Sequence, residues 1–395
     1  MHVAVVGGGV LGSVLAWRLA ARGHSVALVE PVGFGHAGSA SGDRTRLVRA
    51  LYDEPSFAAS GHASLALFRA WSRELGAPLV DLDGVLYLND EGGDGAAFAR
   101  WVDLGVANVK RLGGATEELT PAEVARRWPA IDTRGLARAV FEPSAGFARA
   151  ALATRAFADA AMATGRVERV PVRATAVKTH AGAASGVAFQ GGSIEAELVV
   201  VAAGSEGAAL VAPMTGDLGI RRLPHWTAYF QLDAADAAAM RAPNVPCWAD
   251  LGNLLYGFPD DGEAGFKVAW HAPRSRPATA DPRQSTAAHD AAPTAADVER
   301  LRLAATRRFP ALARARATSV FPCAYDATPD ESFRVGPVPG VARLWFVGGL
   351  SGHGFKHAPA IGESIAALAS GEEPVVDLTP FALAPPPSAL PSTRR

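Results

Sequence analysis

The chain has 395 residues, of which 49% are hydrophobic and 19% are charged, a composition that excludes global disorder and supplies core for roughly two or three domains. Its 38 Lys and Arg residues balance 39 Asp and Glu residues, so the net charge of −1 gives no electrostatic reason to bind nucleic acid or an anionic membrane. The two cysteines, Cys247 and Cys323, exclude a disulfide framework, and without a Cys-x-x-Cys pair or nearby His cluster we expect no metal site.

The sequence contains no run of ~18 apolar residues of the kind that spans a membrane. The apolar N-terminus lacks the basic leader of a secretory signal, and its consecutive glycines suit a turn better than an apolar helix. We therefore expect a cytoplasmic protein.

The first thirty residues have the order of a dinucleotide-binding unit. An apolar run at residues 2–6 predicts a buried parallel strand, which leads into the G-x-G-x-x-G segment Gly7–Gly12. That segment opens a helix to about Arg22, and residues 25–29 form a second strand that ends at Glu30. A strand, glycines, a helix, a strand and a terminal acid in this order predict dinucleotide binding more strongly than the glycines alone.

Each position of the glycine segment has a physical role. Gly7 permits the tight turn, Gly9 lets the backbone approach a pyrophosphate, and Gly12 lets the helix pack closely on the strand. Val10 and Leu11, which lie between them, begin the helix whose N-terminal N–H groups face the phosphates.

Glu30 indicates which dinucleotides fit. It lies 18 residues after Gly12, where its carboxylate would accept a hydrogen bond from a ribose hydroxyl. A carboxylate there repels a 2′-phosphate, so NADP is disfavoured, whereas NAD and FAD are not distinguished by the motif.

The elements that follow are predicted from periodicity, capping residues and turn residues. Thr120 to Glu123 form a capping box with proline at the first helical position. The predicted helices cover residues 55–75, 121–127 and 147–164, and the predicted strands cover 84–89, 167–180, 185–190 and 194–203. Residues 273–296 are expected to form a surface loop, and the tail from about Thr379 is expected to be disordered.

Near the C-terminus a second glycine-containing segment follows a strand. Residues 344–349 predict a buried strand, the run Ser351–Lys356 contains two glycines, and a helix is expected from about Pro359 to Leu368. Backbone can approach a ligand at such a helix N-terminus. A nicotinamide enzyme has little use for a second site of this kind, whereas the long FAD molecule must be held at both ends.

These elements predict the α/β fold class: a Rossmann-type nucleotide-binding domain interrupted by an α+β substrate domain built on an antiparallel or mixed sheet. We expect a discontinuous FAD-binding domain at residues 1–80, 145–212 and 320–372, a substrate-binding domain at 81–144 and 213–319, and a Pro-rich tail at 373–395.

With these segments assembled, the chain resembles the monomeric sarcosine oxidase and N-methyltryptophan oxidase family, which belongs to the D-amino-acid-oxidase-like superfamily with its GR2-type FAD-binding domain. The likeness extends from residue 1 to about 372. It rests on these motifs in order: Gly7–Gly12 with Glu30, Thr45-Arg46-Leu47-Val48-Arg49 with Tyr52, Arg127-Trp128-Pro129, Phe141-Glu142-Pro143, Tyr256-Gly257-Phe258-Pro259, Phe266-Lys267 with His271, Cys323-Ala324-Tyr325, Thr328-Pro329-Asp330-Glu331 and Ser351–Lys356.

The resemblance implies FAD as the cofactor. Besides the first glycine segment and Glu30, it implies flavin contacts from Gly42, Arg44, Thr45, Arg46, Gly349, Ser351, Gly352, His353, Gly354 and Lys356. It also aligns Cys323 with the cysteine that, in this family, carries FAD through a thioether to the flavin 8α carbon. The alternative for Cys323 is that of most unpaired cysteines, a small buried hydrophobic side chain.

The resemblance further implies catalytic positions. Lys267 matches the lysine that lies over the flavin ring and promotes the reaction of reduced flavin with dioxygen, whereas the plain alternative is an exposed strand lysine. The chain has four lysines among its 38 basic residues, and this scarcity favours a specific role. Arg49 and Lys356 match the pair that binds a substrate carboxylate, and Arg46 would share a face with Arg49 if that stretch is helical. Alone, Arg49 could be a helix-surface cation.

The remaining implied positions surround the substrate. Tyr256, His271 and Tyr325 match residues that line the pocket, although both tyrosines suit an ordinary aromatic core equally well. Trp248 falls near a methionine of the pocket wall, and Gly42 stands where sarcosine oxidases have a histidine. Residues 223–226 also lack an Arg-Gln pair. These departures leave the chemistry intact and argue against taking sarcosine itself as the substrate.

The sequence thus predicts an FAD-dependent amine oxidase that oxidises the C–N bond of a secondary or cyclic amino acid to an imine and reduces dioxygen to hydrogen peroxide. A biosynthetic desaturase of a cyclic imino acid is a variant with the same residues. An amino acid dehydrogenase with a non-oxygen acceptor is a second alternative, although Lys267 favours the oxidase. A non-catalytic FAD sensor would not need the combination of Cys323, Lys267 and Lys356. A monomer is expected, because monomers are common in the resembled family.

Overall fold

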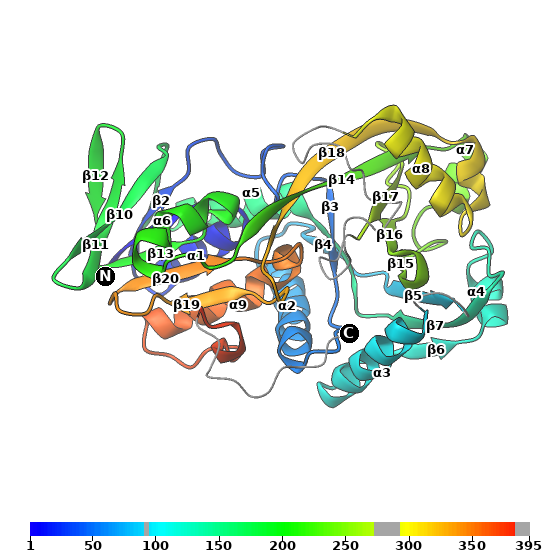
Figure 1. Cartoon of the computed structure of the whole chain (residues 1–395), viewed down its shortest axis with the longest axis horizontal. Coiled ribbons are helices and arrows are strands. Elements are labelled where there is room, and N and C mark those ends of the chain that lie inside the picture. The colour runs from blue at the N-terminus through cyan, green and yellow to red at the C-terminus, as the bar shows by residue number, and fades with distance from the viewer. Residues whose placement is uncertain (91–94, 272–292, 384–395) are drawn as a thin grey trace. The chain divides into compact units, whose positions relative to one another are not determined.

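The computed structural model describes residues 1–90, 95–271 and 293–383, which form two compact units (Figure 1). The first unit comprises Met1–Gly42, Ala150–Leu223 and the described chain from Tyr325 onward. The second unit comprises Asp43–Arg149 and Pro224–Ala324.

The first unit is built on a six-stranded sheet with the order β19-β20-β13-β1-β2-β9. All adjacent strands pair in parallel except β19, which is antiparallel to β20. Because both faces are covered, its central strands are continuous runs of buried valine, alanine and leucine. The strands are β1 (His2–Val6), β2 (Ser25–Val29), β9 (Val167–Val170), β13 (Leu198–Val201), β19 (Arg334–Pro337) and β20 (Leu344–Gly348).

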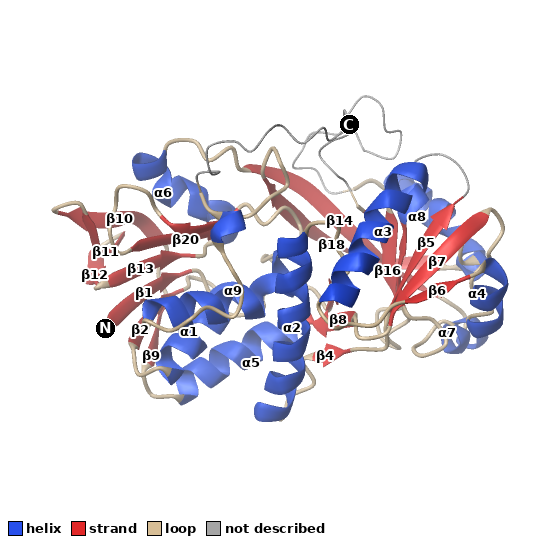
Figure 2. Ribbon diagram, turned by 90° about the horizontal axis from the view of Figure 1, so that it is seen from below, coloured by secondary structure: helices blue, strands red, loops and turns tan. Residues whose placement is uncertain are grey.

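Three helices cover one face of this sheet, α1 (Val10–Ala21), α5 (Ala150–Ala163) and α9 (Gly354–Ala369), as Figure 2 shows. The other face carries α6 (Gly207–Thr215) and a three-stranded antiparallel sheet. That sheet consists of β10 (Ala174–His180), β11 (Ala183–Phe189) and β12 (Gly192–Glu195). The first unit also contains two short 3-10 turns, η1 (Gly204–Glu206) and η4 (Thr379–Phe381).

The second unit is built on an eight-stranded mixed sheet with the order β18-β14-β17-β16-β15-β5-β7-β6. Strand β15 runs parallel to β5, and β16, β17, β7 and β6 pair antiparallel with their neighbours. The strands are β5 (Val85–Asp90), β6 (Glu117–Leu119), β7 (Leu136–Glu142), β14 (Arg221–Gln231), β15 (Cys247–Asp250), β16 (Leu255–Phe258), β17 (Phe266–Trp270) and β18 (Arg316–Ala327). The division between the units falls within β14 and β18.

A smaller sheet of the second unit has the order β3-β8-β4, with β3 (Thr45–Val48), β8 (Gly146–Arg149) and β4 (Val80–Asp81). The helices of the second unit are α2 (Pro55–Glu74), α3 (Gly95–Arg111), α4 (Pro121–Arg127), α7 (Ala234–Ala239) and α8 (Ala295–Thr306). Its 3-10 turns are η2 (Leu251–Asn253) and η3 (Pro310–Arg314). The predicted capping box is present: Thr120 Oγ1 accepts from the N–H of Glu123, whose carboxylate accepts from the N–H of Thr120.

Several predicted element boundaries are wrong. Helix α9 begins at Gly354 rather than at Pro359, which lies inside the helix. The stretch that carries Arg46 is strand β3 rather than a helix, so Arg46 and Arg49 do not share a helical face. Residues 146–149, partly assigned to a helix, form β8 before α5 begins.

The predicted disorder of the tail is wrong at its start. Residues 379–381 form η4, and the Phe381 ring is buried 5.2 Å from the ring of Phe333. Residues 384–395 and most of the predicted 273–296 loop lie outside the described residues, and α8 begins at Ala295.

The compact units divide the chain differently from the predicted domains. The expected FAD-binding domain included residues 43–80, whereas these residues belong to the second unit. The assignment of cofactor and substrate binding to particular segments stays a prediction.

Within the parts of the chain that the structure describes, no helix combines the length and the apolarity needed to cross a membrane. The same residues contain no cluster of His, Cys, Asp and Glu side chains arranged to hold a metal ion.

Candidate functional site

The glycine segment of the first unit is a tight turn that requires glycine. Gly7 has φ +106°, and a Cβ there would lie 2.5 Å from the carbonyl oxygen of Ala202, just after β13. A Cβ on Gly8 would lie 2.6 Å from Cγ of Glu30, and one on Gly12 would lie 1.8 Å from the carbonyl oxygen of Gly7. The turn therefore has the close backbone packing that a dinucleotide cradle needs.

The N-terminus of α1 is suited to an anion. Gly9 precedes the helix and has no side chain to cap it, and no acid lies in the first turn of the helix. A Cβ on Gly9 would meet only Ser41 Oγ, at 3.4 Å, and that oxygen accepts from the N–H of Val10 at 3.1 Å. The first turn presents backbone donors and the positive end of the helix dipole, which favour a pyrophosphate.

Glu30 is held at the tip of β2, beside the glycine turn. Its side chain accepts hydrogen bonds from the N–H groups of Gly8 at 2.9 Å, Val32 at 2.8 Å and Gly33 at 3.2 Å. The carboxylate is thus fixed where the first turn ends, as a ribose-binding acid would be. The glycines, helix terminus and carboxylate of the first unit fit the nucleotide half of FAD.

The second glycine segment is also a constrained turn. Gly349, Ser351 and Gly352 have φ values of +61°, +46° and +78°. The Ser351 hydroxyl donates to the carbonyl of Gly349 at 3.1 Å, and its N–H donates to the carbonyl of Asp326 at 3.0 Å. A Cβ on Gly352 would lie 2.7 Å from ring carbons of Tyr325, so this ring packs directly against the glycine backbone.

Lys356 lies in the first turn of α9, immediately after Gly354 and Phe355. Its side chain is buried, and Nζ lies 3.5 Å from the carbonyl oxygen of His353, the residue that precedes the helix. A cation in a first turn opposes the helix dipole. Lys356 therefore does not stabilise α9 through the helix dipole. A buried cation at this position is compatible with the predicted role of Lys356 in binding an anion.

In the second unit, Lys267 lies on β17 and its ammonium group is buried. Nζ donates to Asp43 Oδ2 at 2.5 Å, to the Thr45 carbonyl at 2.9 Å and to Thr45 Oγ1 at 3.2 Å. Burial lowers the pKa of Lys267 to about 8, and Arg46 adds to the decrease, while Asp43 opposes it. The sequence singled out Lys267, Thr45 and Arg46, and the structure brings them together around Asp43, which the sequence did not single out.

Cys323, on β18, is half-buried in the field of the same charges. Burial raises the pKa of its thiol, whereas the positive charges of Arg46 and Lys267 lower it. The Arg46 guanidinium also lies over the ring of Phe321, with Cζ 5.6 Å from the centroid. The residue expected to carry the flavin therefore lies near the lysine and arginine expected to contact it.

Arg49, just beyond β3, has a buried guanidinium enclosed by aromatic rings. Its Cζ lies 3.7 Å from the ring centroid of Tyr52 and 5.2 Å from that of Trp101, and Nη1 donates to the carbonyl of Leu51. Cation–π contacts hold the plane of the guanidinium. The arginine is a fixed, buried cation rather than a mobile surface one.

Glu142 orders the backbone that follows Arg49. This fully buried carboxylate accepts from the N–H groups of Ala50 at 2.8 Å and Leu51 at 3.3 Å and from the hydroxyl of Tyr87 at 2.9 Å. Burial raises its pKa, although these donors and Arg49 act in the opposite direction. Glu142 belongs to the motif Phe141-Glu142-Pro143, but the sequence did not indicate what its carboxylate does.

The aromatic and histidine positions divide into two groups. Tyr256 on β16 lies near His225, with the phenol oxygen 3.4 Å from His225 Nε2, and His271 acts electrostatically on the same imidazole. Trp248, in contrast, is completely buried, stacked on Phe266 with ring centroids 6.1 Å apart. Trp248 has no surface to offer to a pocket in the structure, so we treat it as a core residue.

Two other predicted cofactor contacts have different surroundings. A Cβ on Gly42 would lie 1.8 Å from the carbonyl oxygen of His36, which explains why a larger residue is absent there. The half-exposed Arg44 pairs with Asp261 at 2.6 Å and Glu263 at 2.8 Å. The Arg44 guanidinium therefore pairs with two acidic side chains of the second unit, and its predicted contact with the cofactor stays a prediction.

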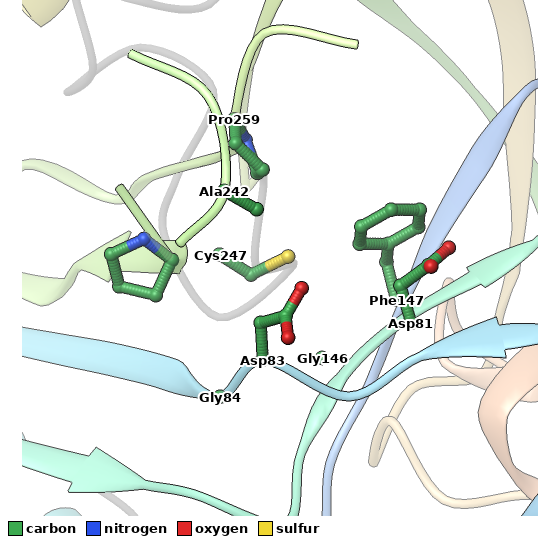
Figure 3. A pocket seen from close by; sticks show the side chains of 9 residues that line it. Asp81, Asp83, Gly84, Gly146, Phe147, Ala242, Cys247 and Pro259 are labelled. Atoms are coloured by element: carbon green, nitrogen blue, oxygen red, sulfur yellow. The ribbon is translucent and has the colours of Figure 1, made fainter. Parts of the chain in front are cut away.

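Figure 3 shows a small pocket of the second unit that is too narrow to hold a water molecule, and its lining includes Asp81, Asp83 and Cys247. None of the predicted catalytic residues lines it. It is therefore not the proposed substrate site.

The sequence matches the family model described as FAD dependent oxidoreductase, DAO, over residues 2–368. A relative of assigned function, N-methyl-L-tryptophan oxidase of Yersinia pestis (strain Pestoides F), is 26% identical over 381 residues, which cover 96% of this chain and 98% of that protein.

Solved structures share the fold. L-proline dehydrogenase from P. horikoshii superposes with a TM-score of 0.83 at 22% identity, covering 97% of this chain and 96% of that one. Glycine oxidase from Geobacillus kaustophilus gives a TM-score of 0.80 at 22% identity, covering 97% and 98%. These likenesses confirm the predicted fold class. Because the family model spans nearly the whole chain, the protein belongs to the DAO family of FAD-dependent oxidoreductases.

Proposed function

We propose that this oxidoreductase converts a secondary (N-methyl) or cyclic amino acid into the corresponding imine. The substrate loses a hydride from carbon and a proton from nitrogen, and dioxygen takes up two electrons and two protons to become hydrogen peroxide. Water then adds to the imine and hydrolyses it. FAD, when bound, supplies the redox chemistry by accepting the hydride.

The observation that carries this proposal is the buried, aromatic-enclosed guanidinium of Arg49. A planar cation held by Tyr52 and Trp101 is pre-organised to bind a carboxylate by charge-assisted hydrogen bonds. Such a site selects amino acids over simple amines. As the resemblance implies, we assign Lys356 as the second cation that binds this carboxylate.

The surroundings of the reacting amine favour its neutral form. Burial lowers the pKa of His225 to about 3, and its electrostatic interactions with His271 and Arg46 act in the same direction, so this imidazole is uncharged. His271 and Tyr256 would orient the substrate, and Tyr325 would complete the wall of its pocket. Neither histidine has to act as an essential base, because a bound neutral amine can release hydride directly.

We further propose that Cys323 carries FAD through a thioether bond. The support is its half-buried position in the field of Arg46 and Lys267. Acid precipitation of the purified protein tests this: covalent FAD stays with the pellet, whereas release of all the flavin into the supernatant would rule out the bond. Cys323→Ser should release its flavin in the same assay.

The amino acid substrate and the electron acceptor need one further experiment. A panel of N-methyl, cyclic and D- or L-amino acids is mixed anaerobically with the enzyme, and bleaching of the flavin absorbance is recorded. Admission of oxygen then gives recoloration with peroxide for an oxidase, and slow recoloration that a quinone accelerates for a dehydrogenase. A cyclic substrate that yields a stable, unhydrolysed product indicates the desaturase. If no amino acid bleaches the flavin, the proposed function is wrong.

A further inference from the structure

The carboxylate of Asp43 is the centre of a buried cluster that the implied chemistry of Lys267 does not by itself explain. Oδ2 accepts from Lys267 Nζ at 2.5 Å and from Arg46 Nη1 at 2.6 Å. Oδ1 accepts from the Tyr229 hydroxyl at 2.7 Å and from the N–H of Arg44 at 2.7 Å. Both oxygens of a side chain that is 1% exposed are thus occupied by strong donors.

The same contacts specify the position of the Lys267 ammonium. Its three N–H bonds have three acceptors: Asp43 Oδ2 and the two oxygens of Thr45. The ring centroids of Phe258 and Tyr229 lie 4.6 Å and 5.4 Å from Nζ. The lysine side chain is 2% exposed, so water does not replace any of these contacts.

Charge balance in this cluster depends on Asp43. Arg46 is permanently charged and disfavours a second cation beside it. Two other described groups in the field of Lys267 and Arg46 are Cys323, where burial raises the pKa of the thiol, and His225, where burial lowers the pKa to about 3 and leaves the imidazole neutral. Burial would raise the pKa of Asp43, but Lys267 and Arg46 hold it far below its ordinary value.

We propose that Asp43 is a positioning residue for Lys267: its carboxylate keeps the buried amine protonated and fixes the ammonium against Thr45. Without this anion the cluster would hold two adjacent buried cations, and the lysine, unlike the arginine, can lose its proton. The proposal rests on the proposed function for the use made of this cation, but the protonation and position of Lys267 can be measured without turnover.

The experiment uses FAD-containing protein labelled with ε-¹³C-lysine. The chain has only four lysines, Lys110, Lys178, Lys267 and Lys356, so four signals are expected, and Lys267→Met and Lys178→Met assign two of them. In the wild type, the two Hε signals of Lys267 should be distinct because the side chain is held, and the titration midpoint should lie below its ordinary value because the ammonium is buried. A motionally averaged Lys267 signal with the ordinary midpoint of about 10.4 would overturn the proposal without any variant.

Asp43→Asn should move the Lys267 midpoint down by at least about one pH unit, a tenfold loss of proton affinity. Asp43→Glu, which keeps the anion, should restore most of that affinity. Tyr229→Phe removes one hydrogen bond from Asp43 without changing its charge and should shift the midpoint far less. An unchanged midpoint in folded Asp43→Asn would refute the role, because loss of a merely structural contact would alter stability and not this titration.

A second readout links the cluster to the proposed reaction. In Asp43→Asn, the pH profile for reoxidation of the reduced enzyme by dioxygen should move to lower pH by the same interval as the Lys267 titration. The titration requires neither substrate nor oxygen. If no amino acid reduces the enzyme, the proposed function fails while the positioning role of Asp43 is still decided by the titration.

Discussion

Arg49 combines a permanent charge with a fixed plane, so its replacement should act mainly on substrate binding. Lysine at this position keeps the charge but loses the fork and the contact with Tyr52. We expect Arg49→Lys to raise KM for the amino acid about 10- to 100-fold, the effect of one charge-assisted hydrogen bond, with a smaller change in kcat. Steady-state kinetics measure both. Arg73→Lys, on the exposed surface of α2, is the matched control, and an unaltered KM in the Arg49 variant would exclude the assigned role.

Lys267 should act on the oxidative half-reaction. A fixed buried cation stabilises negative charge that develops near it, so Lys267→Met should slow reoxidation by dioxygen far more than reduction by the amino acid. Stopped-flow measurement of the two half-reactions separates these effects. Lys178→Met, which removes a surface lysine paired with Glu195, should change neither rate. Equal oxygen reactivity in the Lys267 variant and wild type would remove the role from this residue.

His225 should make the protein less stable in mild acid. Its pKa is lowered to about 3 by burial and neighbouring positive charge, whereas the unfolded chain binds a proton near pH 6.5. Between these values the unfolded state holds more protons, so the free energy of unfolding falls as pH falls. Between pH 6.5 and pH 5, the contribution of His225 lowers the free energy of unfolding by about 2 kcal/mol.

Denaturant unfolding of wild type and His225→Phe at these two pH values measures this contribution to the free energy of unfolding. The variant should lose less stability over the interval, with His180→Phe, an exposed histidine on β10, as the control. If wild type and His225→Phe lose the same amount, the imidazole is not buried in its neutral form.

The sequence pointed to individual residues better than to their partners. Scarcity of lysine and the quoted motifs singled out Lys267, and the structure gives it a buried, specific environment. Asp43 carries no comparable signal, because one aspartate among 39 acidic residues becomes informative only when β3 and β17 bring it to the lysine. Trp101 lies on α3, far along the chain from Arg49, so its contact could not be inferred from periodicity.

Among the elements, those specified by local sequence were predicted closely. Strand β1, helix α1 and strand β2 follow one another within thirty residues, and their bounds agree with the prediction to within one residue. The capping box at Thr120 is likewise a local device, and it is present. In each case the residues that determine the element lie inside it or next to it.

Elements that depend on packing were predicted less well. Proline was taken to begin α9, but Pro359 lies inside the helix, where it has no N–H to donate to the carbonyl of Phe355. Strand β3 is a strand because it pairs with β8, a hundred residues away. The start of the tail is ordered because Phe381 packs on Phe333, a contact that composition does not reveal.

The turn between β1 and α1 yields a prediction about cofactor binding. A methyl group on Gly12 would lie 1.8 Å from the backbone oxygen of Gly7, so Gly12→Ala must displace the turn or the helix. We expect purified Gly12→Ala to contain less than about a tenth of the wild-type FAD per chain, since the N-terminal donors of α1 would be misplaced. The ratio of flavin to protein absorbance measures this. Gly38→Ala, whose nearest neighbour is the His36 side chain at 3.2 Å, should keep its FAD; equal flavin content in both variants would contradict the cradle.

At the level of the molecule, the alternation of strands and helices was sufficient for the fold class but not for the arrangement of the strands. The order of the eight-stranded sheet places β15 beside β5 in parallel, although more than 150 residues separate them in the chain. Such long-range pairing is determined by the packing of whole elements. The pairing of β3 with β8 likewise joins residues 45–48 to the second unit, whose boundary falls at Asp43 rather than near residue 80.

The central claim, that the protein oxidises an amine that carries a carboxylate, is tested most directly with matched pairs of compounds. Each N-methyl or cyclic amino acid is compared anaerobically with the amine that lacks its carboxyl group, and flavin bleaching is followed. The account predicts that at least one amino acid bleaches the flavin rapidly while its decarboxylated partner does so at least about tenfold more slowly, consistent with a charge-assisted contact. Equal bleaching by both members of every pair, or by neither, would contradict it.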